Sequence, residues 1–170
     1  MVRIPPAPIA GPDADRPSVD RIERLRDGTV STLYRTLLHS GVVAAGWCEL
    51  GTAIRWRTSL DDRLRELVTC QTARLTRASY EWRAHVQLAE AAGVTSDQLR
   101  SLPDFENESS FSARDRAALR FATAVVNAEV DDDLFAATSE HFDRRGILEI
   151  AATASYYVAI SRLLDACGVE

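Results

Sequence analysis

The sequence is poor in cysteine and lacks the arrangements in which cysteines usually act. Its three cysteines, Cys48, Cys70 and Cys167, are far apart, odd in number and form no CxxC pair. They therefore indicate neither a disulfide framework nor a thiolate metal site, and we expect reduced core residues. The aspartates at 131–133 do not replace such a site, because adjacent side chains diverge on a helix. We predict no metal ion and no cofactor.

Concentrated positive charge and long apolar runs are also lacking. The net charge is −5, and the basic residues are interspersed among Asp and Glu, so no extended patch exists to neutralise phosphates. This excludes nucleic acid and an anionic membrane as predicted partners. The first twelve residues contain four prolines and no unbroken apolar stretch, and no run approaches the ~18 residues that span a bilayer. We expect a cytoplasmic protein.

The composition is that of an ordinary globular protein. With 170 residues, of which 46% are hydrophobic and 26% charged, the chain is long enough for one core that buries about 70% of the unfolded surface. Residues 1–16 are rich in Pro, Ala and Gly and carry no helical period, which predicts a flexible N-terminal arm. Residues 17–170 are predicted to form a single domain.

Alternation with a period of two is absent wherever helical spacing is present, so we predict an all-α fold. One pair of segments is similar in sequence: Arg65–Val68 and Leu148–Ala151 both precede a run of small residues, which indicates a faint internal duplication of a helix pair. Helices are expected over 18–26, from a cap at Thr29 or Ser31 to residue 39, over 42–56, in two segments between 59 and 93 that join near 76, over 95–102, from 112 through 126, over 131–141 and over 147–167, with Gly46 and Gly51 interrupting the third.

The stretch Ser59–Gly93 predicts two helices joined near Thr76. Ser59, with Asp62 three residues later, resembles an N-terminal capping box, and Gly93 suits the position that follows a helix. On the second helix Glu81 and His85 rise from one face together with the residue at 78.

Glu66 lies on the first of these helices, which has little polar surface to expose. An ionised carboxylate is costly to bury unless it meets a proton donor, a cation or water. His85 is the nearest candidate in sequence. Glu66, Glu81 and His85 are therefore predicted to form an acid–base set, because an imidazole titrates near neutral pH and carboxylates can orient it.

The spacing of Glu66, Ala78, Glu81 and His85 is similar to the Glu–x11–Cys–x2–Cys–x3–His signature of the alkylhydroperoxidase D branch of the carboxymuconolactone decarboxylase superfamily. The flanking segments LRELV, YEWRAH and AEAAGV also resemble that superfamily, and the resemblance covers roughly residues 30–168. It implies an AhpD-like helical fold of duplicated helix pairs and a homo-oligomer, whether dimer, trimer or hexamer. Two long apolar helices in a short chain also favour oligomerisation.

The chain departs from that signature at both cysteines, which are replaced by Ala78 and Glu81. Peroxide reduction needs a thiolate and a resolving thiol, so alkylhydroperoxidase or peroxiredoxin-type activity is the least favoured alternative. The other branch, typified by 4-carboxymuconolactone decarboxylase, is similar in using a histidine without the redox pair. It implies a cofactor-free lyase, a decarboxylase or isomerase, that acts on a small organic acid or lactone.

In that interpretation His85 delivers or relays a proton, Glu81 orients the ring, Glu66 tunes it, and Tyr80 and Trp82 shape a substrate pocket. A structural explanation remains open for each residue. Glu81 can pair with Arg77, and His85 can be a satisfied core histidine. The alternative function is a non-catalytic, ring-forming protein that binds a small molecule or a partner. A pocket lined by the three residues would favour the enzyme, and a filled site would favour the binding protein.

Overall fold

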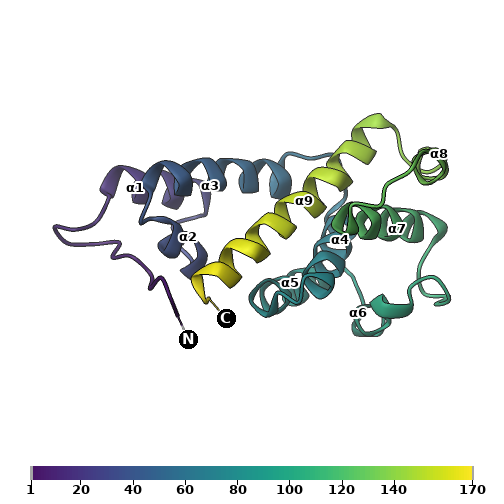
Figure 1. Ribbon diagram of the computed structural model, residues 1–170, viewed down its shortest axis with the longest axis horizontal. Coiled ribbons are helices and arrows are strands. Elements are labelled where there is room, and N and C mark those ends of the chain that lie inside the picture. The colour runs from purple at the N-terminus through teal and green to yellow at the C-terminus, as the bar shows by residue number, and fades with distance from the viewer. Residues whose placement is uncertain (1, 170) are drawn as a thin grey trace. The chain divides into compact units, whose positions relative to one another are not determined.

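The computed structural model describes residues 2–169, and within that range it is all-α with no strand (Figure 1). The predicted fold class is therefore confirmed. The elements in chain order are α1 (Arg16–Leu25), α2 (Thr32–Leu37), α3 (Gly41–Trp56), α4 (Asp62–Leu75), α5 (Ser79–Ala91), α6 (Ser96–Ser101), the 3-10 turn η1 (Leu102–Asp104), α7 (Ala113–Asn127), α8 (Asp132–Ser139) and α9 (Arg144–Cys167).

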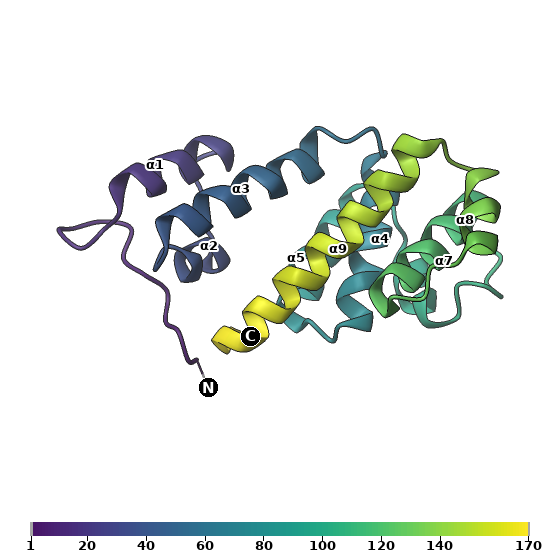
Figure 2. The same ribbon diagram turned by 45° about the horizontal axis from the view of Figure 1, so that its top comes forward.

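The chain divides into two compact units, although a single domain was predicted for residues 17–170. Unit 1 runs to Arg57 and resumes at Leu163, and unit 2 is Thr58–Arg162. Unit 1 contains α1, α2 and α3. Unit 2 contains α4 to α8 and most of α9, and Figure 2 shows α4, α5 and α7 of this unit from a second side.

The core of unit 2 has two apolar clusters that meet along α4. Leu64 and Val68 pack with α7 and with the first turns of α9, whereas Leu67 and Cys70 pack with α5, α6 and the segment that follows α6. Apolar residues therefore cover two faces of α4. Every residue from Leu64 to Ala73 is buried, including the polar ones. This is why the polar groups of α4 must find partners inside the protein.

The start of α4 differs from the prediction. Asp61, not Ser59, is the N-cap, and its carboxylate accepts a hydrogen bond of 2.8 Å from the Leu64 amide. Ser59 instead donates to Glu149 of α9, through its amide at 2.8 Å and its hydroxyl at 2.6 Å. The sequence permits either cap, because Ser and Asp are both favoured there, and Glu149 provides Ser59 with a charged acceptor.

Other predicted boundaries are confirmed. Capping boxes begin α6 at Thr95 and α7 at Ser112, and the Asp131 side chain caps α8. Gly93 follows α5 in the left-handed conformation, with φ of 93°. The expected interruption of α3 is wrong: the helix continues through its glycines from Gly41 to Trp56.

Helix α9 is long and apolar enough, by length and composition, to cross a membrane. This feature was not identified from the sequence, because the sequence contains no unbroken apolar run of that length. Half of its most apolar window is buried within the protein. Core helices of soluble proteins pass the same test, so α9 gives only weak support to a membrane-spanning role.

The predicted arm makes several hydrogen bonds within unit 1. The amides of Arg3 and Ile4 donate to the Cys167 carbonyl, and the Ala7 amide donates to the Arg35 carbonyl at 2.9 Å. The His39 ring also hydrogen-bonds the Pro5 carbonyl at 2.8 Å. His39, to which the sequence assigned no role, therefore holds this segment.

Candidate acid–base site

The centre of the site is a hydrogen bond between two buried side chains on adjacent helices. Nδ1 of His85 on α5 lies 2.6 Å from Oε2 of Glu66 on α4. The two residues are 4% and 2% exposed, so water does not compete for the bond. With Glu66 ionised, Nδ1 carries the proton, and Nε2 is left as the nitrogen that can accept or release one.

The second carboxylate faces that remaining nitrogen. Oε2 of Glu81 lies 3.5 Å from Nε2 of His85, one helical turn back along α5. This separation is longer than an ordinary hydrogen bond, so Glu81 is not the residue that holds the ring. The orienting role was predicted for Glu81, but the geometry gives it to Glu66. Glu81 lies next to the nitrogen that would exchange protons.

Two neighbours that the sequence analysis did not single out complete the surroundings. Nη2 of Arg65 lies 3.6 Å from Oε1 of Glu66, while its Nη1 binds Asp62 at 2.8 Å. The ring of Tyr157 on α9 packs edge-on against the imidazole, with centroids 4.8 Å apart. Arg65 adjoins Glu66 in the sequence and could have been proposed as its partner. Nothing in the sequence pointed to Tyr157.

Cys70 lies near Glu66 and is a thiol rather than a thiolate. Burial and the negative charge of Glu66 together raise its pKa to about 12. All three cysteines are free and buried. A nucleophilic or peroxide-reducing cysteine needs a lowered thiol pKa, so Cys70 has the opposite property.

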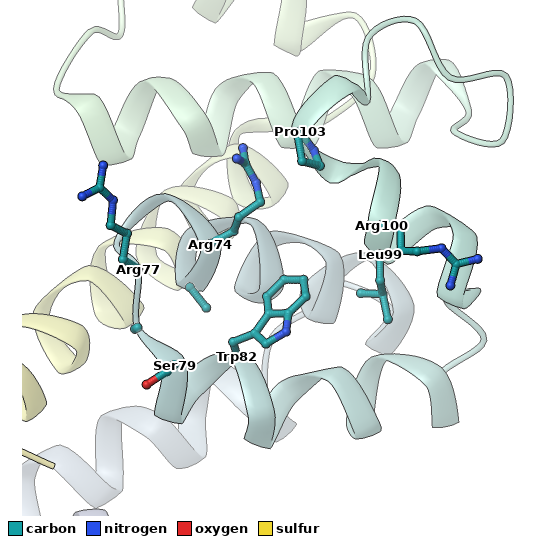
Figure 3. Close-up of a pocket in the computed structure, with 9 residues that line it drawn as sticks. Arg74, Arg77, Ser79, Trp82, Leu99, Arg100 and Pro103 are labelled. Atoms are coloured by element: carbon teal, nitrogen blue, oxygen red, sulfur yellow. The ribbon is translucent and has the colours of Figure 1, made fainter. Parts of the chain in front are cut away.

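A pocket of about 390 Å³ opens beside the site, at the corner between α4 and α5 (Figure 3). Trp82, one of the two residues predicted to shape a substrate pocket, lines it. Tyr80 is half-buried and is not part of its lining. Its full lining is Ala73, Arg74, Arg77, Ala78, Ser79, Trp82, Leu99, Arg100 and Pro103.

The three acid–base residues do not line this pocket. Glu66, Glu81 and His85 are brought together in the protein interior, with Ala78 at the start of α5 bordering the pocket one turn away from Glu81. The expected convergence is present, but the imidazole is enclosed by neighbouring side chains. Among residues 2–169, no group of three or more His, Cys, Asp or Glu side chains is arranged to hold a metal ion.

Comparison with known proteins supports the resemblance seen in the motif. The profile of the Carboxymuconolactone decarboxylase family matches residues 42–124, a range that includes Glu66, Glu81 and His85. This match supports the carboxymuconolactone decarboxylase/AhpD-like superfamily as the one that the chain resembles. A curated relative, the uncharacterized protein YnjA of Escherichia coli strain K12, is 32% identical over 110 residues, covering 63% of this chain and 57% of YnjA.

Solved structures share the fold of this chain. A variant of the debrominase Bmp8 in complex with 2,3,4-tribromopyrrole matches with a TM-score of 0.82 and 18% identity, covering 100% of this chain and 91% of the other. An alkylhydroperoxidase AhpD core protein from Ralstonia eutropha JMP134, described as peroxidase-related, matches with a TM-score of 0.77 and 23% identity over 98% and 92%. The TM-scores establish a shared fold, and a shared fold does not by itself imply a shared function.

Proposed function

We propose that this protein is a cofactor-free lyase, a decarboxylase or isomerase of a small organic acid or lactone, that works by acid–base chemistry at His85. The observation that carries the proposal is the imidazole with one carboxylate at each nitrogen, 2.6 Å and 3.5 Å away. A histidine that only fills space has no need of two buried carboxylates, each costly to desolvate. A residue that moves protons does need an orienting partner and a second group for exchange.

The proposed step is protonation of a carbanion equivalent. When the carbon–carboxylate bond of the substrate breaks, CO2 leaves, and the bonding electrons spread into the adjacent carbonyl as an enolate. Protonated His85 supplies the proton to carbon from Nε2, directly or through Glu81. Glu66 keeps the proton on Nδ1 throughout. Water then returns a proton to the imidazole.

The relatives support the class of ligand rather than the reaction. The debrominase neighbour was crystallised with a bromopyrrole, a small ring compound, so this fold accommodates molecules of that size. Thiol-dependent reduction is not what we propose here, because the motif positions hold Ala78 and Glu81 and the Cys70 thiol has a raised pKa.

A second candidate is favoured by one observation. His85 is enclosed and packs against Tyr157, as expected of a ring-forming binding protein that has kept the scaffold without its chemistry. In that case the Glu66–His85 bond joins α4 to α5 and has no other task. The two candidates predict different effects of a substitution at His85. It lowers turnover if the protein is the enzyme, and it affects only folding if the protein is the binding protein.

The test is a screen of lactones and β-keto acids for CO2 release, with wild type and His85→Gln side by side. Loss of a general acid lowers kcat by roughly 10²–10⁴-fold, and we expect a decrease of that size. His141→Gln is the matched control, because His141 is exposed and lies outside the site. Folded His85→Gln protein, verified by circular dichroism, with full turnover would contradict the role of His85.

Location and assembly are part of the same proposal. Three buried, free cysteines are consistent with a cytoplasmic protein. The α3 helix of unit 1 exposes Val42, Val43, Leu50 and Trp56, with 88%, 45%, 51% and 52% of their surfaces accessible. Large apolar side chains on one exposed helix support a homo-oligomer. We propose no nucleic-acid or membrane partner.

A further inference from the structure

The pocket at the corner of α4 and α5 combines positive charge with an apolar wall. Its nine lining residues include three arginines and no Asp or Glu. The indole of Trp82 lies at the centre of the view in Figure 3, with the side chains of Arg74 and Pro103 on one side of it. A volume of about 390 Å³ is within the range of small-molecule sites.

Within residues 2–169, two of the three guanidinium groups have no anionic partner. Arg100 is paired with Asp97 and, in Figure 3, reaches away from Trp82. Arg74 donates only to the neutral side-chain oxygen of Gln71, at 3.1 Å. The side chain of Arg77 makes no hydrogen bond or ion pair anywhere in residues 2–169. Burial lowers the pKa of Arg74, although the group stays cationic.

The backbone turn at Arg77 does not itself require an arginine, because glycine is the usual residue in this conformation. Arg77 follows the last residues of α4 with φ of 57°, and the next amide, that of Ala78, bonds back to the Ala73 carbonyl at 2.9 Å. This is the Schellman arrangement, in which glycine is usual. The same arrangement after α5 does use glycine, at Gly93. Asp27 and Ala128 also adopt positive φ, so the argument depends on the unpaired guanidinium and not on strain.

We propose that this pocket binds the carboxylate of a small planar organic acid, with Arg74 and Arg77 holding the carboxylate and Trp82 stacking on its planar body. Guanidinium groups bind carboxylates by charge-assisted hydrogen bonds, and an indole offers a flat apolar surface to a ring. Inorganic phosphate lacks the body that Trp82 would contact. That the bound acid is the substrate rests on the proposed function, whereas the binding itself does not.

The pocket is also placed to serve the acid–base set. Trp82 lies on α5 within one helical turn of both Glu81 and His85, and Ala78, the N-cap of α5, lies one turn before Glu81. An acid anchored by Arg74 and Arg77 at the α4 end of the pocket would therefore lie next to the segment that carries both groups. Trp82, predicted from the sequence as a pocket residue, would then act in recognition.

The experiment is calorimetric titration of the full chain with four probes. Benzoate has both features, cyclohexanecarboxylate lacks the planar ring, benzamide lacks the charge, and inorganic phosphate lacks the body. We expect benzoate to bind most tightly, and benzamide and phosphate to bind at least about tenfold more weakly. Equal affinity for benzamide would overturn the role of the arginines, and equal affinity for phosphate would overturn that of Trp82. No saturable binding of benzoate would overturn the proposal as a whole.

Variants separate this proposal from the proposed function. Arg77→Gln should weaken benzoate binding by about tenfold or more, while Arg83→Gln, an exposed arginine of α5 outside the pocket, should not. Arg77→Gly should weaken benzoate binding by the same factor as Arg77→Gln. It should unfold at a temperature no lower than that of the wild type, so misfolding cannot be the cause of the weaker binding. Unchanged binding in both Arg77 variants would contradict the proposal. His85→Gln should bind benzoate like the wild type, so turnover and binding can fail independently.

Discussion

Glu66 and Glu149 occupy corresponding places in the two similar segments of the sequence but have different surroundings. Glu66 on α4 is buried and bonds to an imidazole on the adjacent helix. Glu149 on α9 is also largely covered, with 13% of its side chain exposed, and accepts hydrogen bonds from Ser59 and Arg145. Ser59 lies two residues before the N-cap of α4, so Glu149 joins the start of one helix to another.

This comparison shows that a covered carboxylate does not by itself identify a site. The partners of Glu149 are a hydroxyl, an amide and a guanidinium, which do not exchange protons near neutral pH. The partner of Glu66 is a group that does. The carboxylate at the corresponding place therefore joins two segments in one case and bonds an imidazole in the other.

The largest expected effect comes from removing each carboxylate in turn. Glu66→Ala leaves the His85 ring and the Arg65 guanidinium without their buried anion, and we expect it to lower the free energy of unfolding by about 3–5 kcal/mol. Glu149→Ala removes hydrogen bonds nearer the surface and should cost about 1–2 kcal/mol. Urea unfolding of both variants at neutral pH measures the difference.

A matched substitution distinguishes charge from packing. Glu66→Gln keeps the shape and an oxygen that accepts from His85 Nδ1, so it should recover much of the stability lost in Glu66→Ala. Turnover should remain low in Glu66→Gln, because the amide cannot stabilise a charged imidazole. If Glu149→Ala proves as destabilising as Glu66→Ala, the two environments are equivalent and the comparison fails.

The sequence was sufficient for features that depend on local spacing. Helical periodicity predicted the all-α fold, and the spacing of Glu66, Glu81 and His85 placed them on facing helices. Contacts between residues far apart in the sequence could not be predicted from local spacing. Ser59 was interpreted as a cap because its partner, Glu149, lies 90 residues away, and Tyr157 lies on a helix whose packing the sequence does not define.

The pocket arginines were missed for a different reason. Arg77 was considered only as a partner that could pair with Glu81, four residues along the chain. Its φ and its position beside Trp82 are properties of the folded corner. The sequence could not distinguish which carboxylate holds His85, because both lie at suitable spacings.

A smaller effect is expected in the pH dependence of stability. Burial opposes ionisation of Glu149, but the hydrogen bonds from Ser59 and Arg145 outweigh it and hold the pKa below its ordinary value of 4.5. A lowered pKa contributes stability that is present above 4.5 and is lost as the pH falls through the folded-state value. The stability difference between wild type and Glu149→Gln should therefore shrink on the acid side of that value.

The control for this titration is Glu140→Gln, which removes one exposed carboxylate at the end of α8. It changes net charge by the same amount as Glu149→Gln. Urea midpoints measured across the acid range should move with pH in Glu140→Gln as they do in the wild type. A constant difference between wild type and Glu149→Gln at every pH would show that the bonds of Glu149 do not depend on its charge.

The smallest effect is expected at Cys70, which shares the surroundings of Glu66. Burial and the Glu66 charge raise the thiol pKa to about 12, so almost no thiolate is present near neutral pH. Iodoacetamide should therefore leave Cys70 of the folded protein unmodified and any turnover unchanged, whereas unfolding in urea should expose all three cysteines to alkylation. Peptide mass spectrometry after timed labelling measures the modification at each position. Rapid labelling of Cys70 in the folded protein, accompanied by loss of a hydroperoxide-dependent activity, would instead place a reactive thiol beside Glu66 and return the chain to the redox chemistry that its motif positions lack.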